Sequence, residues 1–328
     1  MPTSFAHRAF VPKPIKAEAS FSLKPGEKYH RFAARETSLV RDELFCSWIV
    51  DHGTKAMLNV PNSKILDYFV DDASWHLATK KHAEYLLRHW EAHVRHYAVA
   101  RDALYGSAAS LCRAVRKGES KSILSQFRRD YQAGYAFCDY ILGAWAVIYD
   151  TEKHVSAKYG EVLGVVNALD KPIEYFKMKR DLLRLSTTKV LEKYGWLKSY
   201  SPHHPPYSRK ELEILRRETD ADEVARQLRQ FKKNERAFGD LIDSVRNKAD
   251  RTRLRMVHEY AFLKTDRVDV WKRWHFLKQP FYGHLMRLIP GADLSDVCNL
   301  SIRETEELLR GVMPVTLQEL KARSENRV

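Results

Sequence analysis

Four histidines between residues 82 and 96 have a spacing that could bind a metal ion. His82, His89, His93 and His96 are 7, 4 and 3 residues apart, so they share one face of a helix. His89 and His93, at i and i+4, could place two imidazole nitrogens on one ion. Each histidine also directly precedes a residue of an apolar helical seam (Ala83, Trp90, Val94, Tyr97). This placement favours rings that pack at the edge of a core, so we predict no metal site.

A second group of candidate ligand-binding residues consists of single charged residues. Each interrupts the otherwise apolar face, or seam, of a predicted helix. Arg101 interrupts the seam of the segment 76–104, and Glu235 interrupts that of 221–249. An isolated charge is costly to bury, so each of these residues needs a partner or a ligand. The third segment contains the stretch HEYAFLKTDRVDVWKR, and its charged interruption is Arg267. The positions at spacing 4, 3, 4, 3 are Met256, Tyr260, Leu263, Arg267, Val270, Trp274 and Leu277, and all of them except Arg267 are apolar or aromatic.

Glu235 and Arg267 could neutralise each other. If the two segments fold back near Asp250, these residues lie 15 and 17 positions from the turn, almost level. We then expect an ion pair that fixes the register of two antiparallel helices. The turn sequence NKADRTR contains neither Gly nor Pro, so one continuous helix is the competing interpretation, in which the two residues cannot meet.

Motifs of common catalytic centres are missing. The sequence contains no GxxxxGK[ST], GxGxxG, GxSxG or HExxH, and its four cysteines form no CxxC pair. We therefore assign no catalytic residue, no metal and no cofactor. Whether the chain is an enzyme stays open, because a site assembled from scattered residues would carry no motif.

The pattern along the chain predicts a mostly α-helical protein. Residues 1–30, with four prolines and scattered lysines, are expected to form an extended basic arm. A single domain then spans 31–328. Residues 31–72 are predicted as a helix followed by a small β-hairpin around Pro61, Asn62 and Ser63, and 73–328 as a helical body with long antiparallel helices. Ser208 and the Ser301–Glu304 pair are expected to cap helices.

Composition indicates a globular chain whose excess positive charge lies mostly on solvated helix faces. Of 328 residues 44% are hydrophobic, and the net charge is +14. Such an excess attracts anionic small molecules or nucleic acid, although stretches such as RRETDADEVARQLRQFKKNER are typical of solvated helix faces. The N-terminus has no apolar leader segment, and no window resembles a membrane span. We expect a cytoplasmic protein with no membrane partner.

The second half resembles a known arrangement. LDKPIEYFKMKRDLLRL, then VLEKYGWL, a long helical pair ending in HEYAFLKTDRVDVWKR, and finally IPGADLSDVCNLSIRETEELLRG is similar to the helical middle region of phosphoenolpyruvate-utilising phosphotransferases, such as phosphoenolpyruvate synthase-like enzymes and rifampin phosphotransferase. The resemblance covers roughly residues 165–328. In the family, a nucleotide-binding domain and a swivelling domain with a Thr-Ser-His segment supply the chemistry, and this chain contains no Thr-Ser-His.

The resemblance implies a stand-alone acceptor-binding or linker module without its own catalytic centre. Its partner would be a separate swivelling-domain or ATP-binding phosphotransferase subunit, with this chain as one component of a split system. A basic helical nucleic-acid-binding protein is the alternative. The candidate ligand-binding residues are Arg35, His89, His93, Arg101, Lys264, Arg267 and Trp274.

Overall fold

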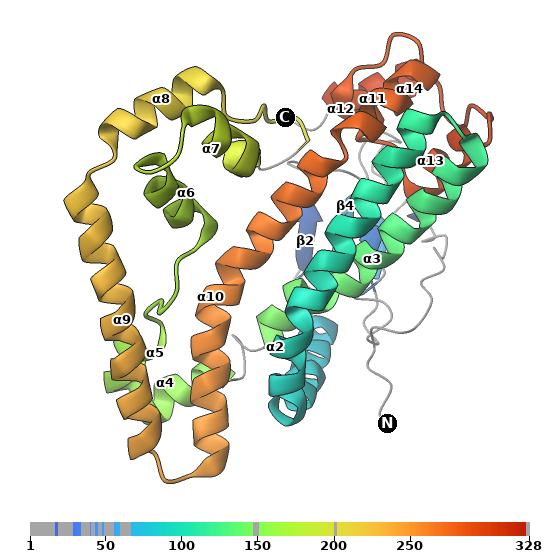
Figure 1. Ribbon diagram of the computed structural model, residues 1–328. Helices are drawn as coiled ribbons and strands as arrows, with labels where there is room; N and C mark the ends of the chain where they lie inside the picture. The colour runs from blue at the N-terminus through green and yellow to red at the C-terminus, as the bar shows by residue number, and fades with distance from the viewer. Residues whose placement is uncertain are drawn as a thin grey trace.

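The computed structural model describes residues 17–18, 29–33, 40, 43–44, 48, 56–59, 67–146, 151–199 and 202–325. This part of the chain is mostly α-helical, as predicted (Figure 1). Its helices are α2 (Asp72–Lys117), α3 (Ser120–Ala146), α4 (Lys153–Tyr159), η4 (Gly160–Val162), α5 (Leu163–Val166), α6 (Glu174–Leu182), α7 (Thr187–Tyr194), η5 (Gly195–Lys198), α8 (Arg209–Glu218), α9 (Ala221–Ser244), α10 (Lys248–Leu277), α11 (Gln279–Leu288), α12 (Leu294–Val297), α13 (Ile302–Leu309) and α14 (Leu317–Glu325).

Short strands lie near the N-terminus: β1 (Ala17–Glu18), β2 (Tyr29–Ala33), β3 (Ala56–Asn59) and β4 (Asp67–Asp71). They are ordered β1-β3-β4-β2, and β4 pairs antiparallel with both β3 and β2. The turn predicted around Pro61, Asn62 and Ser63 lies outside the described residues, so the hairpin stays a prediction, as does the arm 1–30. A helix was expected to begin at Arg31, but residues 31–33 belong to β2.

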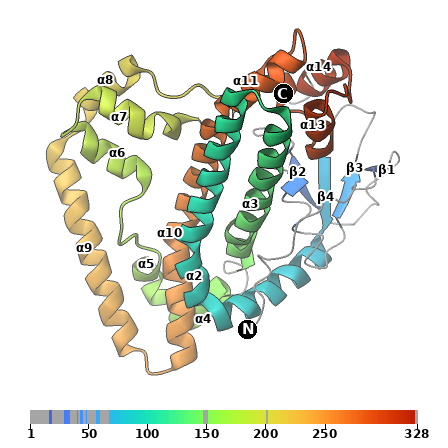
Figure 2. The same cartoon turned by 45° about the vertical axis from the view of Figure 1, so that its right-hand side comes forward.

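Three long helices form the main core. α2 and α3 are antiparallel, and Gly118 ends α2 with a φ of 72°, the left-handed conformation that a helix C-terminus favours. α10 packs beside them and runs parallel to α2, since Tyr97 meets Asp266 and Cys112 meets the carbonyl of Leu277 farther along both helices. The shorter α11–α14 gather at one end of this bundle (Figure 2).

A second, smaller core lies in the lobe formed by α6, α7, η5 and α8. Its buried members are Met178, Leu182, Val190, Tyr194, Trp196, Leu197 and Leu212, and Phe276 of α10 packs against them. Asp181 organises the polar side of this lobe, because Lys193 Nζ and Tyr194 Oη donate to its Oδ2 at 2.7 and 2.8 Å. Ser208 and Glu211 form a capping box at α8, and Ser301 and Glu304 form one at α13, so both predicted caps are confirmed.

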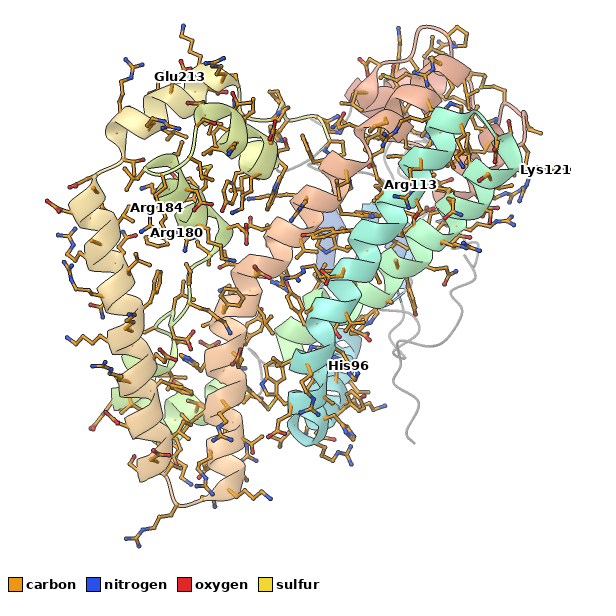
Figure 3. The ribbon with its side chains drawn as sticks, in the orientation of Figure 1. His96, Arg113, Lys121, Arg180, Arg184 and Glu213 are labelled. Carbon is orange, nitrogen blue, oxygen red and sulfur yellow. The ribbon has the colours of Figure 1, made fainter. Side chains whose placement is uncertain are left out.

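The predicted pairing of Glu235 with Arg267 is wrong. The chain does turn, between Ser244 and Lys248, so one continuous helix is also excluded. However, α9 and α10 diverge from this turn (Figure 1). The segment 163–182 lies between them: Asn234 of α9 donates to the carbonyl of Leu169, and Phe231 meets the ring of Phe176. Arg180 and Arg184 are seen in the same space in Figure 3.

Arg267 has a different partner. It is buried, and it donates from Nη1 to the carbonyl oxygen of Ile141, in the last turns of α3, while its guanidinium lies 5.9 Å from the Tyr260 ring centroid. Glu235 is exposed on α9. Arg267 therefore stabilises the packing of α10 on α3 rather than of α10 on α9.

A buried ionic cluster ties the three long helices together. Asp130 of α3 is fully buried and accepts hydrogen bonds from Ser107 of α2 at 3.0 Å and from Trp274 Nε1 of α10 at 2.8 Å. Lys278, 2% exposed, lies 3.3 Å from the same carboxylate and places Nζ over the Trp274 ring. Burial lowers the pKa of Lys278, and the charge of Asp130 acts against that effect.

Removing one member of this cluster should destabilise the protein strongly. In the variant Asp130→Asn, acceptors for Ser107 and Trp274 remain, but Lys278 loses its counter-charge inside the core. We expect the free energy of unfolding, measured by urea denaturation, to fall by about 3–5 kcal/mol. The double variant Asp130→Asn/Lys278→Met should recover most of this loss, because no unpaired charge is left. A double variant as unstable as the single one would contradict the assignment.

Candidate functional site

A cleft of about 320 Å³ lies between the main core and the smaller lobe. Its floor is α10, one wall is α2, and the opposite wall is formed by the start of α6 and by η5. The lining residues are Arg101, Asp102, Tyr105, Glu174, Trp196, Asp266, Asp269, Val270 and Arg273. The volume suits a small molecule, since ligand pockets commonly span about 300–1,000 Å³.

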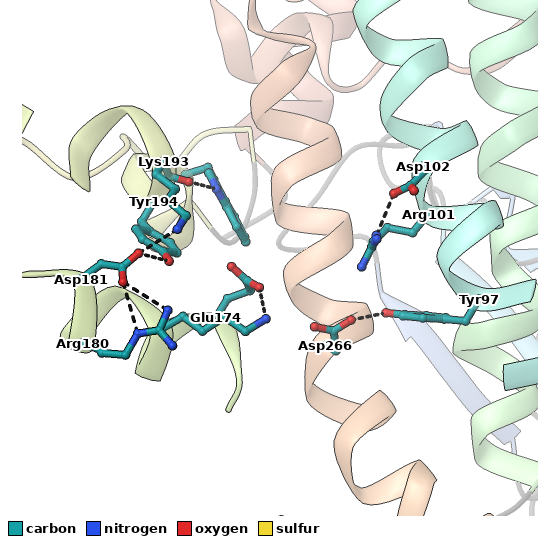
Figure 4. A network of polar contacts seen from close by, with 11 residues as sticks. Tyr97, Arg101, Asp102, Glu174, Arg180, Asp181, Lys193, Tyr194 and Asp266 are labelled. Carbon is teal, nitrogen blue, oxygen red and sulfur yellow. Dashed lines mark hydrogen bonds and ion pairs between the residues drawn. The ribbon is translucent and has the colours of Figure 1, made fainter. Parts of the chain in front are cut away.

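The floor of the cleft carries both signs of charge on one helix face. Asp266, Asp269 and Arg273 are separated by 3 and 4 residues, so they project from the same side of α10. Glu174, at the first position of α6, faces Asp266 across the cleft, and Arg101 reaches in from α2 (Figure 4). The cleft therefore offers hydrogen-bond acceptors and donors from three segments that are distant in sequence.

The two floor carboxylates are buried yet only partly satisfied. Asp266 and Asp269 are 7% and 6% exposed. Tyr97 donates to Asp266 Oδ2 at 2.8 Å, and Lys272 Nζ lies 3.2 Å from Asp269 Oδ1. Among the described residues, no donor reaches the second oxygen of either group. Burial raises the pKa of both carboxyl groups, and the neighbouring cations, Lys177 for Asp266 and Lys272 for Asp269, compensate only in part.

Arg273 lies at the other end of the floor, between aromatic rings. Its guanidinium carbon is 4.8 Å from the Tyr105 ring centroid and 5.8 Å from that of Trp196. Trp196 itself is fixed by a hydrogen bond from Nε1 to the carbonyl of Lys193. No carboxylate of the described residues lies within 4 Å of Arg273, although four acids share the cleft with it. Its N–H groups are therefore open to a ligand.

The remaining cation of the cleft already has a partner. Arg101 Nε donates to Asp102 Oδ1 at 3.0 Å, and this pair lies on the partly exposed rim. The two side chains neutralise each other without help from the floor. Among the described residues of the predicted site, Arg101 is the one that lines the cleft.

The other predicted site residues lie elsewhere. Trp274 is fully buried against Asp130, Arg267 contacts α3, and Lys264 is exposed on α10. His93 packs between the rings of Trp90 and Tyr140, and burial lowers its pKa to about 4. His89 contacts the ring of Tyr85. Arg35 lies outside the described residues. The structure thus does not bring together the six predicted residues that it describes.

The histidine face shows ring packing rather than a cluster of ligands. Within the described residues, no group of three or more His, Cys, Asp or Glu side chains is arranged to hold a metal ion.

In the same part of the chain, no helix is both long and apolar enough to cross a membrane.

A scan against protein-family models finds no match, and searches of curated proteins and of solved structures find no significant similarity.

The buried carboxylates should weaken the fold at neutral pH. Below the usual aspartate pKa of about 3.9, Asp269 is protonated in the folded and unfolded states and has no effect. As the pH rises, the unfolded chain ionises first, so the folded state loses stability until its own raised pKa is passed. We expect Asp269→Asn to unfold at a higher temperature than the wild type at pH 7, and the difference to vanish near pH 3.

Asp102→Asn provides the matched control for this measurement. Asp102 lines the same cleft, but its side chain is 67% exposed. Its substitution should change stability by less than about 0.5 kcal/mol at either pH. If Asp269→Asn were destabilising at pH 7, Asp269 would be a structural partner of Lys272 and not a strained group of the cleft.

Proposed function

We propose that the chain is a helical module that binds a small molecule in the cleft between α2, α6, η5 and α10. The observation that carries this proposal is the pair of nearly buried carboxylates, Asp266 and Asp269, each with one oxygen that faces no donor. Both oxygens open to the cleft although the residues are largely buried, so a donor group of a ligand can take the place of water on each of them.

The position of the cleft, between the main core and the smaller lobe, also suits a linker module. One wall belongs to the main core and the other to the smaller lobe, so an occupant contacts both. Together with the resemblance to the helical region of phosphoenolpyruvate-utilising phosphotransferases, this supports an acceptor-binding or linker role. In this proposal a separate swivelling-domain or ATP-binding subunit delivers the phosphoryl group. Phosphate transfer from ATP by the purified chain alone would contradict it.

Filling the cleft should abolish ligand binding. Asp102 is exposed on the rim, so a larger side chain there reaches into the cleft without disturbing the core. In a fragment screen by saturation-transfer NMR, we expect fragments that bind the wild type to be lost with Asp102→Trp. Ala103→Trp is the matched control, because Ala103 is exposed on the same helix and does not line the cleft. Fragments that bind both variants equally would place the ligand elsewhere.

A second candidate function, nucleic-acid binding, is favoured by one surface of α9. Arg226, Arg229, Lys233 and Arg236 are exposed at spacing 3, 4 and 3, which places them on one helix face. No carboxylate of the described residues lies within 4 Å of any of them. They extend along about 15 Å of the helix axis, at 1.5 Å per residue.

Salt dependence tests this alternative. If the four cations contact phosphates, the logarithm of the affinity for duplex DNA should fall with the logarithm of salt concentration with a slope near −0.9 per phosphate contacted. Lys233→Glu should make the slope shallower, whereas Lys264→Glu, exposed on α10, should not. An equal effect of the two substitutions would show binding through net charge alone and would reject α9 as the site.

A further inference from the structure

On the cleft floor a gap separates Asp269 from Arg273, two oppositely charged side chains whose spacing would ordinarily allow an ion pair. Asp269 and Arg273 are four residues apart on α10, the spacing at which helical side chains lie about 5–6 Å apart at Cβ and often form ion pairs. They form none. Asp269 is paired with Lys272 from one side, and Arg273 is drawn onto the rings of Tyr105 and Trp196.

The acidic side of this gap accepts hydrogen bonds. The free oxygens belong to Asp266 and Asp269, and Glu174 adds a third carboxylate, bound to Lys177 at 2.7 Å. A ligand that carried only negative charge would be repelled by these three groups. A ligand ammonium group would instead supply donors to the two oxygens that have none.

The basic side of the gap donates hydrogen bonds. The exposed guanidinium of Arg273 lies over two aromatic rings, and these contacts favour one orientation before a ligand arrives. A fork of N–H groups in this state matches a carboxylate, which accepts two parallel hydrogen bonds. A ligand with only a positive charge would leave this donor unused and would be repelled by it.

We propose that the cleft recognises an amino-acid-type zwitterion, with its ammonium group at Asp266 and Asp269 and its carboxylate at Arg273. The inference rests on the proposed function, since it names the ligand class of the same cleft. The Arg101–Asp102 pair on the rim is neutral as a unit and imposes no further charge. Trp196 and Val270 line the space that remains for the body of the ligand.

Three related compounds test the inference by isothermal titration calorimetry. Phenylalanine has both charges, phenethylamine has only the ammonium group, and 3-phenylpropanoate has only the carboxylate. We expect phenylalanine to bind at least tenfold more tightly than either analogue, because each analogue leaves one end of the gap without its partner. An affinity of 3-phenylpropanoate or phenethylamine equal to that of phenylalanine would overturn the assignment.

Two substitutions show which end of the ligand each side chain holds. Arg273→Gln should reduce the affinity for phenylalanine to that for phenethylamine and leave the affinity for phenethylamine unchanged or improved. Asp269→Asn should weaken both amines and leave 3-phenylpropanoate unchanged or improved. Arg255→Gln is the control, because Arg255 is exposed on the same helix far from the cleft. If Arg273→Gln weakened phenylalanine and phenethylamine equally, Arg273 would not hold the carboxylate.

The outcome separates this inference from the proposed function. If none of the three compounds binds while other fragments are displaced by Asp102→Trp, the cleft is a ligand site and the zwitterion assignment is wrong. If Asp102→Trp changes no fragment and no compound, both proposals fail.

Discussion

The arrangement of the long helices depends on one buried carboxylate. Asp130 is contacted from α2 by Ser107, from α10 by Trp274 and from the end of α10 by Lys278, so α3 cannot shift along either neighbour without breaking a charged hydrogen bond. A buried ion pair contributes little net stability over an apolar pair of the same size, but it sets the register. Tyr97 and Asp266 repeat the link between α2 and α10 farther down. The floor and one wall of the cleft are thereby fixed relative to each other.

The sequence predicted what is decided locally. Both capping boxes involve residues three positions apart, and the helices themselves follow from apolar spacing. The three charged interruptions could not be interpreted in the same way. Arg267 bonds to a backbone carbonyl of α3, Arg101 lies on the rim of the cleft, and Glu235 faces outward. A seam extrapolated at 3.5 residues per turn drifts by about 20° per heptad from a straight helix, so position in the seam alone does not say what a residue meets.

The cleft residues of α10 also have helical spacing in the sequence, but they lie beside the predicted apolar seam and not in it. Asp266, Asp269 and Arg273 have helical spacing and lie one position before Arg267, Val270 and Trp274 of the predicted seam. They would ordinarily belong to the solvated edge of the helix. They line a cleft because Glu174 and Trp196 are brought against this edge by the smaller lobe, and that contact joins segments about 70 to 95 residues apart, which no local pattern encodes.

The total charge and the charge of the cleft point to different ligands. The excess of +14 predicts an anionic partner, and on α9 a row of cations without counter-ions fits that expectation. The cleft instead contains four carboxylates and two guanidinium groups. A field summed over the whole surface governs how fast charged molecules arrive, whereas the groups within a few ångströms govern which molecule stays. The floor of the cleft, with two buried carboxylates at one end and the exposed guanidinium of Arg273 at the other, therefore says more about the ligand than composition does.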